Sequence, residues 1–117
     1  MTASFTVRKH LSDDGVVRLA VGGEVDLSTG QALRHLIVNA ALQRPTRLIV
    51  DLGQVTFMDS TGVDALVTGR AVALEHGAAY RVTNPCSVVR RALEVTDTLA
   101  MLTGDGPAAL QLQRGTR

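Results

Sequence analysis

The stretch RLIVDLGQVTFMDSTGVDALV, residues 47–67, decides the fold class of this 117-residue chain. Its first part, RLIVDL, is a nearly continuous apolar run of strand length, which is typical of a central strand covered on both faces or nearly so. TFMD extends or follows that strand. From Ser60 the periodicity becomes helical and continues to about His76, where Gly77 supplies a stop. The residues expected on the buried face of this helix are Val63, Leu66, Val67, Ala71 and Leu74.

The residues before this stretch predict a hairpin and a first helix. SFTVRKHL and VVRLAVGGEV are rich in β-branched residues and are joined by turn formers at residues 12–15. After Asp26, Ser28 or Thr29 can cap a helix that Pro45 ends. Its expected buried face comprises Leu33, Leu36, Ile37, Ala40 and Ala41.

The residues after it predict a further strand and helix. AAYRVTN is of strand length, and NPCSVVRRALEVT begins with capping chemistry and places Val88, Val89, Ala92 and Leu93 on one face. We interpret LAMLTG as a last strand and AALQLQR as a terminal helix whose end frays. The element order predicts one α/β domain with a mixed, mostly parallel sheet of four to five strands, an antiparallel N-terminal edge strand and about four helices.

Composition excludes several classes of function. Twelve Lys and Arg residues against eleven acids give a net charge of +1, and Phe5, Phe57 and Tyr80 are the only aromatic residues. Both observations argue against nucleic acid as a partner. Cys86 is the only cysteine, so no disulfide can form within the chain and a small buried side chain is expected there. No apolar run has the length of a signal peptide or a membrane span, so we expect a cytoplasmic protein with no membrane partner.

Polar residues gather in two segments that each lead into a predicted helix. GGEVDLST, residues 22–29, and TFMDSTG, residues 56–62, follow predicted parallel strands. In open α/β sheets the carboxyl ends of such strands form the binding surface. We therefore expect one polar site made of Asp26, Ser28, Thr29, Asp59, Ser60 and Thr61.

Ser60 allows three interpretations. It can be an N-cap that satisfies a backbone N–H, worth about 1 kcal/mol. It can be the serine of a hydrolase, although Met58 replaces the first glycine of G-x-S-x-G and His76 falls at the far end of the same helix. It can instead be a phospho-acceptor, because a helix N-terminus stabilises an added phosphate. His10, His35 and His76 lack metal-ligand spacing, so neither a metal site nor a cofactor is expected.

In spacing and residue type, GGEVDLSTGQALRHLI, RLIVDLGQVTFMDSTGVDALV and RVTNPCSVVRRALEVT resemble the STAS domains of bacterial anti-sigma factor antagonists. The resemblance runs from Phe5 to about Leu112 and implies a single STAS domain over residues 1–117, with a core of about 5–112. It implies a non-enzymatic regulator that binds an anti-sigma factor serine kinase and frees the sigma factor. Phosphorylation of Ser60, in the D-S-T-G stretch, would switch that binding off, and a PP2C-type phosphatase would restore it.

The expected partner surface covers Asp26, Ser28, Thr29, Asp59, Ser60, Thr61, Gly62 and Asp64, with Thr68 further along the helix. Gly62 is expected to let a partner approach the serine closely. Thr61 is either a second acceptor or a first-turn helix residue. The alternative function is a STAS scaffold that assembles with other proteins without regulation by phosphorylation.

Overall fold

The computed structural model describes residues 4–104, which form a four-stranded sheet and four helices, in the predicted order as far as residue 95. The strands are β1 (Thr6–Leu11), β2 (Val16–Val25), β3 (Arg47–Met58) and β4 (Ala79–Thr83). The helices are α1 (Leu27–Leu42), α2 (Ser60–Glu75), α3 (Ser87–Val95) and α4 (Leu99–Thr103). The α/β class and the strand count are confirmed, and TFM extends the central strand to its twelfth residue.

The strand order in the sheet is β1-β2-β3-β4. β1 pairs antiparallel with β2 at the edge, as predicted, and the turn between them contains Gly15 at φ 84°. β2 pairs parallel with β3, and β3 pairs parallel with β4. The parallel pairs place the carboxyl ends of β2 and β3 at the same end of the sheet, where α1 and α2 begin.

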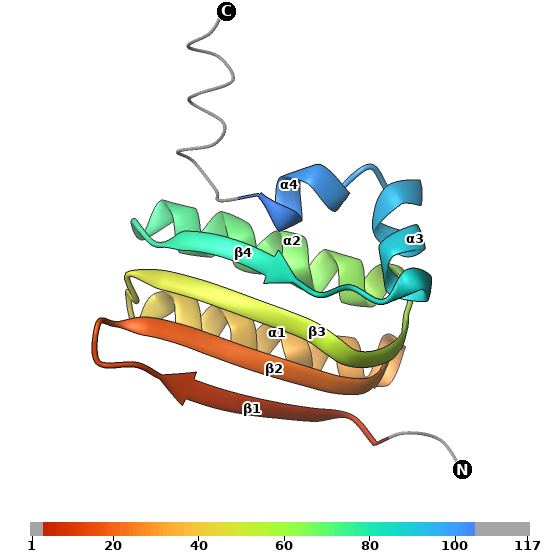
Figure 1. Cartoon of the computed structure of the whole chain (residues 1–117), viewed down its shortest axis with the longest axis horizontal. Coiled ribbons are helices and arrows are strands. Elements are labelled where there is room, and N and C mark those ends of the chain that lie inside the picture. The colour runs from red at the N-terminus through yellow and green to blue at the C-terminus, as the bar shows by residue number, and fades with distance from the viewer. Residues whose placement is uncertain (1–3, 105–117) are drawn as a thin grey trace, which may run out of the picture.

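The two long helices lie on one face of the sheet, and the opposite face is turned to the viewer in Figure 1. This arrangement corrects the expectation that RLIVDL is covered on both faces. Leu48, Val50 and Leu52 are fully buried, whereas the alternate residues Arg47, Ile49 and Asp51 are only half-buried. The uncovered side of β3 tolerates Asp51 because Arg18 of β2 pairs with its carboxylate.

The helix faces are shifted from those that the periodicity predicted. Leu36, Ala71 and Val88 are exposed, although each was expected on a buried face. The contact between α1 and α2 instead uses small residues: Gly69 lies so close to α1 that an added Cβ would come within 2.2 Å of the Ile37 side chain. The close α1–α2 packing therefore selects small side chains, which apolar periodicity alone does not identify.

LAMLTG forms α4 and not a last strand. Leu102 is fully buried, Leu99 and Met101 are half-buried, and the Leu102 N–H donates to the Thr98 carbonyl at 3.0 Å. Apolar residues three apart fit one turn of a helix that packs beside β4, and this contact overrides the strand-like composition. The predicted terminal helix AALQLQR lies outside the described residues.

Tyr80 of β4 ties α2 to the sheet. Its hydroxyl donates to the Leu66 carbonyl at 2.8 Å, and complete burial raises the pKa of Tyr80. Val63 and Leu66 are buried as predicted, and Val67 is half-buried against the core. These contacts hold the first half of α2, and with it Ser60, in a fixed position. Within residues 4–104, no helix is long and apolar enough to cross a membrane.

Candidate functional site

The two polar segments predicted from the sequence meet at one edge of the sheet. The Asp59 N–H donates to the Val25 carbonyl at 3.1 Å, which joins the start of α2 to the end of β2. At the next turn the helices touch, because a Cβ added to Gly30 would lie 2.9 Å from the Thr61 Cβ. We call this edge, formed by residues 24–31 and 56–64, the serine pole.

The first helix of the serine pole is capped by Asp26 and not by Ser28 or Thr29. The Asp26 carboxylate accepts the Ser28 and Thr29 N–H groups at 3.0 and 3.2 Å and the Ser28 hydroxyl at 2.9 Å. In return the Thr29 hydroxyl oxygen accepts the Asp26 N–H at 2.9 Å, which completes a capping box. The hydrogen bonds from Ser28 and Thr29 hold the pKa of Asp26 below its ordinary value. Asp26 is therefore a fixed, ionised carboxylate.

At the second helix, Asp59 is the N-cap and Ser60 is the first helical residue. The Asp59 carboxylate accepts the Thr61 N–H at 2.9 Å. Ser60 is exposed, and its hydroxyl has no hydrogen-bond partner among the described residues. The interpretation of Ser60 as an N-cap is therefore wrong, because the residue before it already satisfies the orphan donor.

The two residues after Ser60 already make contacts within the chain. The Thr61 hydroxyl donates to the Asp59 carboxylate, and the side chain packs against Gly30. Gly62 is buried, and a Cβ there would come within 2.5 Å of Met58 and 2.8 Å of Val25. The space expected for a partner at Gly62 is thus filled by the core, and the glycine serves the packing of α2 on the sheet.

The capping assignment predicts how variants at this turn change stability. Asp59→Ala should lower the free energy of unfolding by about 1 kcal/mol, because the Thr61 N–H loses its acceptor. Asp59→Asn keeps an acceptor and should stay close to the original protein, and Ser60→Ala should also change little. Urea titrations of the three variants check this, and a larger loss in Ser60→Ala than in Asp59→Ala would contradict the assignment.

The serine pole is acidic. Glu24, Asp26, Asp59 and Asp64 lie in its two segments, and neither segment contains a Lys or Arg. Asp64 is exposed one helical turn after Ser60, and the half-buried Thr68 follows one turn later on the same stripe. A protein that docks here meets a negative field around an uncharged hydroxyl.

Two exposed apolar side chains at the serine pole were missed by the sequence analysis. Leu27, the first residue of α1, is 71% exposed, and Phe57, near the end of β3, is 43% exposed. Phe57 is paired with Glu24 just after a register shift at which β3 contains one more residue than β2, and this turns its ring away from the core. Strand alternation alone could not reveal this bulge. The exposure of Leu27 could have been predicted, because this leucine directly follows the residue that caps the helix.

The serine pole lacks the partners that a hydrolase needs. His76 is the C-cap of α2, at the opposite end of the helix from Ser60, and its Nδ1 lies 3.0 Å from the Val72 carbonyl oxygen. In the described part of the chain, no three His, Cys, Asp or Glu residues are grouped to hold a metal ion. The arrangement suits recognition or modification of the hydroxyl rather than nucleophilic attack by it.

Comparison with known proteins places this architecture among characterised relatives. The family model described as Mlab, STAS domain matches residues 10–103. The anti-sigma-F factor antagonist RsfB of Mycobacterium tuberculosis is 33% identical over 90 residues, which cover 77% of this chain and 70% of RsfB. The crystal structure of an anti-sigma factor antagonist from Mycobacterium paratuberculosis superposes with a TM-score of 0.77 at 27% identity, covering 97% of this chain and 99% of the other.

A more distant structure shares the fold. The Bacillus cell fate determinant SpoIIAA in its phosphorylated form superposes with a TM-score of 0.64 at 20% identity, covering 93% of this chain and 98% of SpoIIAA. At this identity the likeness establishes the fold alone.

Proposed function

The chain belongs to the STAS domain family, and from that premise we propose that it is an anti-sigma factor antagonist switched by phosphorylation of Ser60. The unphosphorylated protein binds an anti-sigma factor that is also a serine kinase, and this binding releases the sigma factor. Phosphorylation of Ser60 ends the binding, and a PP2C-type phosphatase resets the protein. The chain itself performs no catalysis in this cycle.

The observation that carries this proposal is the exposed, unbonded hydroxyl of Ser60 at the first position of α2. A kinase needs an accessible hydroxyl, and a hydroxyl already used as a cap would have to break a hydrogen bond first. Asp59 performs the capping, so the Ser60 oxygen is available at no cost to the helix. The backbone N–H groups of the first turn stabilise a phosphate once it is attached.

The partner surface extends from Ser60 in two directions. Along α2 it follows Asp64 and Thr68, which lie on one side of the helix. Across the serine pole it reaches the N-cap Asp26 and the first-turn residues Ser28 and Thr29 of α1. Leu27 and Phe57 add exposed apolar area at the same edge. Interfaces typically combine a few apolar anchors with a polar rim, so these two side chains are the expected anchors. The acidic surroundings predict that basic side chains of the partner pair with the carboxylates around Ser60, whereas the Ser60 hydroxyl itself meets an uncharged contact.

This surface predicts a footprint for the partner. The anti-sigma factor should protect residues 24–31 and 56–68 in a patch of about 800 Å² on this chain, near the standard interface size. Leu27→Ala and Phe57→Ala should each weaken binding by about 2 kcal/mol if they are the anchors. Amide exchange with and without the anti-sigma factor measures the footprint, and protection centred on the hairpin turn at residues 12–15 would contradict it.

The kinase reaction separates this proposal from that of a scaffold. Incubation with the anti-sigma factor and ATP, followed by intact-mass measurement, should add one phosphate, and Ser60→Ala should add none. Thr61→Ala should still be phosphorylated, because the Thr61 hydroxyl is bound to Asp59. A protein that binds the anti-sigma factor stably but never gains mass would be a STAS scaffold without the switch.

A further inference from the structure

The face of the sheet opposite α1 and α2 carries a second surface, separate from the core and turned to the viewer in Figure 1. The strand registers decide which side chains it presents, because paired residues point to the same side. Val17, Leu19 and Val21 face the helices and are buried, so their neighbours in sequence face outward. The outward set from the first three strands is Thr6, Arg8, His10, Val16, Arg18, Ala20, Gly22, Arg47, Ile49, Asp51 and Gln54, followed by the pair Glu24 and Phe57 at the carboxyl ends of β2 and β3.

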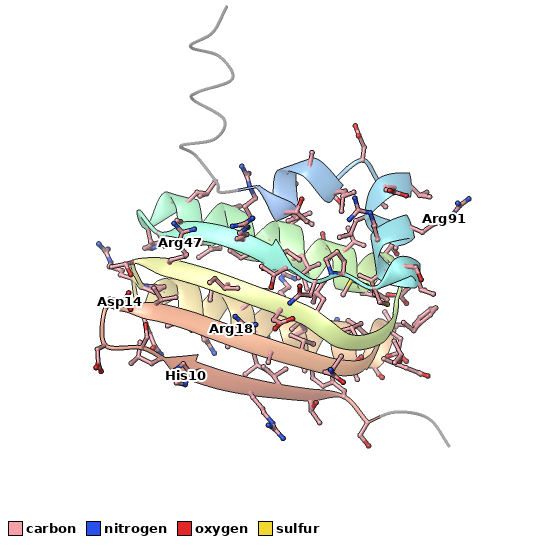
Figure 2. The ribbon with its side chains drawn as sticks, viewed as in Figure 1. His10, Asp14, Arg18, Arg47 and Arg91 are labelled. Atoms are coloured by element: carbon pink, nitrogen blue, oxygen red, sulfur yellow. The ribbon has the colours of Figure 1, made fainter. Side chains whose placement is uncertain are left out.

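Arginine dominates the charge of this face. Arg8, Arg18, Arg47 and Arg81 each come from a different strand, and Figure 2 shows Arg18 and Arg47 with His10 on three neighbouring strands. Lys9, the only lysine of the chain, points to the other side and donates to Gln43 at 3.2 Å. Arginine forks bind carboxylates in a bidentate way that lysine cannot match.

The acidic residues of the face offset part of this charge, because Asp51 neutralises Arg18. Asp51 pairs with Arg18 and also accepts the Gly53 N–H at 2.8 Å and the Asn84 side-chain amide at 3.2 Å. Partial burial alone would raise the pKa of Asp51, but these hydrogen bonds hold it below its ordinary value, so the carboxylate stays ionised and internally bound. Arg8 is exposed and has no ion pair or hydrogen bond with any residue in 4–104.

A hollow lies beside Arg8. It has a volume of about 550 Å³ and is lined by Thr6, Arg8, Ala20, Gly22 and Gln54 among its residues. Its floor is low because Ala20 and Gly22 carry little or no side chain, and its rim offers a hydroxyl, an amide and a guanidinium. Half-buried Val16 and Ile49 supply apolar area on the same face. A hollow with a cationic rim next to apolar area matches the composition of protein interfaces, where arginine is enriched.

We propose that this sheet face binds an acidic, extended peptide segment of a partner protein. A glutamate or aspartate side chain of the segment pairs with Arg8, and alternate apolar side chains lie on Val16, Ala20 and Ile49. A nucleic acid fits less well, because Phe57 is the one exposed aromatic side chain in residues 4–104 and the face also contains Asp51. The opposite charges of this face and the acidic serine pole allow two different partners to bind at once.

The proposal is independent of the switch at Ser60, and its test uses the full chain without any kinase. The probe is a labelled peptide of alternating Glu and Val, compared with a peptide in which Lys replaces Glu. Fluorescence anisotropy at low salt should detect the Glu peptide and not the Lys peptide, and the affinity should fall as salt rises. Backbone chemical shifts should change in β1 and β2 around Arg8 and Ala20.

Variants with equal charge changes locate the site. Arg8→Glu should weaken binding of the Glu peptide by about tenfold, whereas Arg91→Glu, on the exposed surface of α3, should leave it nearly unchanged. Arg8→Gln is a milder second variant, and thermal unfolding confirms that each variant is folded. Equal weakening by Arg8→Glu and Arg91→Glu, shifts centred on Ser60, or tighter binding of a single-stranded DNA of matched charge would each overturn the proposal.

Discussion

Leu66→Ala is expected to lower the free energy of unfolding by about 2 to 5 kcal/mol, the largest stability effect that we predict for a single substitution. Leu66 is fully buried between α2 and the sheet, and its backbone carbonyl accepts the hydroxyl of the equally buried Tyr80. Removing the side chain leaves a cavity under the first half of α2. Since small domains are stable by only about 5 to 15 kcal/mol, the loss should be obvious in a urea titration.

Leu27→Ala is the matched control for this prediction. It removes the same atoms from a leucine that is 71% exposed at the start of α1, so the unfolding midpoint should move little. In binding to the anti-sigma factor the order should reverse. Leu27→Ala should lose more affinity than Leu66→Ala, because Leu27 lies on the expected partner surface. An unchanged unfolding midpoint in Leu66→Ala would contradict the burial of this helix face.

Ser60→Asp is expected to weaken binding to the anti-sigma factor kinase by at least about tenfold, which corresponds to about 1.4 kcal/mol. A kinase that docks on this surface must accommodate an uncharged hydroxyl at Ser60. A carboxylate in the same place is desolvated against it without matched donors. Most of the loss should appear as faster dissociation, which surface plasmon resonance measures directly.

The fold should survive this change. A negative charge at the first helical position gains from the N-terminal N–H groups of α2 but faces the carboxylates of Asp59 and Asp26, so the two local effects oppose each other. Ser60→Ala is the control: it should be folded, bind the kinase and resist phosphorylation. Binding of Ser60→Asp and Ser60→Ala with equal affinity would contradict the switch.

The fold was predictable where one physical signal dominated. The apolar run at residues 47–52 and the switch to helical periodicity at Ser60 correctly predicted a strand followed by a helix. Gly15 and Gly77, both at φ 84°, mark turns that the sequence had identified. The antiparallel edge strand followed from the short turn between the first two strands. These features depend on local composition and spacing, which a single sequence displays directly.

The errors arose where tertiary packing decides the outcome. The exposed Leu36 fits an apolar period, but the close contact of α1 with α2 selects Gly30 and Gly69 instead. LAMLTG has the composition of a strand, yet it becomes a helix because Leu102 packs beside β4. No local pattern reports either contact.

At the serine pole, the sequence identified the right segments and assigned some roles to the wrong neighbours. Asp26 and Asp59 cap the helices, whereas the sequence pattern favoured Ser28 or Thr29 for the first cap and allowed Ser60 for the second. Aspartate and serine have similar capping preferences, so only the geometry distinguishes them. The correction strengthens the interpretation of Ser60 as an acceptor, because its hydroxyl is left unbonded.

The affinity of the nucleotide-loaded anti-sigma factor kinase for the unmodified and the Ser60-phosphorylated protein tests the central claim most directly. Phosphorylation adds about −1.5 to −2 charges and three acceptor oxygens at a position where the partner is matched to an uncharged hydroxyl. Isothermal titration calorimetry should show that the phosphorylated protein binds at least about tenfold more weakly, while its thermal unfolding stays close to that of the unmodified protein. Equal or tighter binding of the phosphorylated protein would contradict the account.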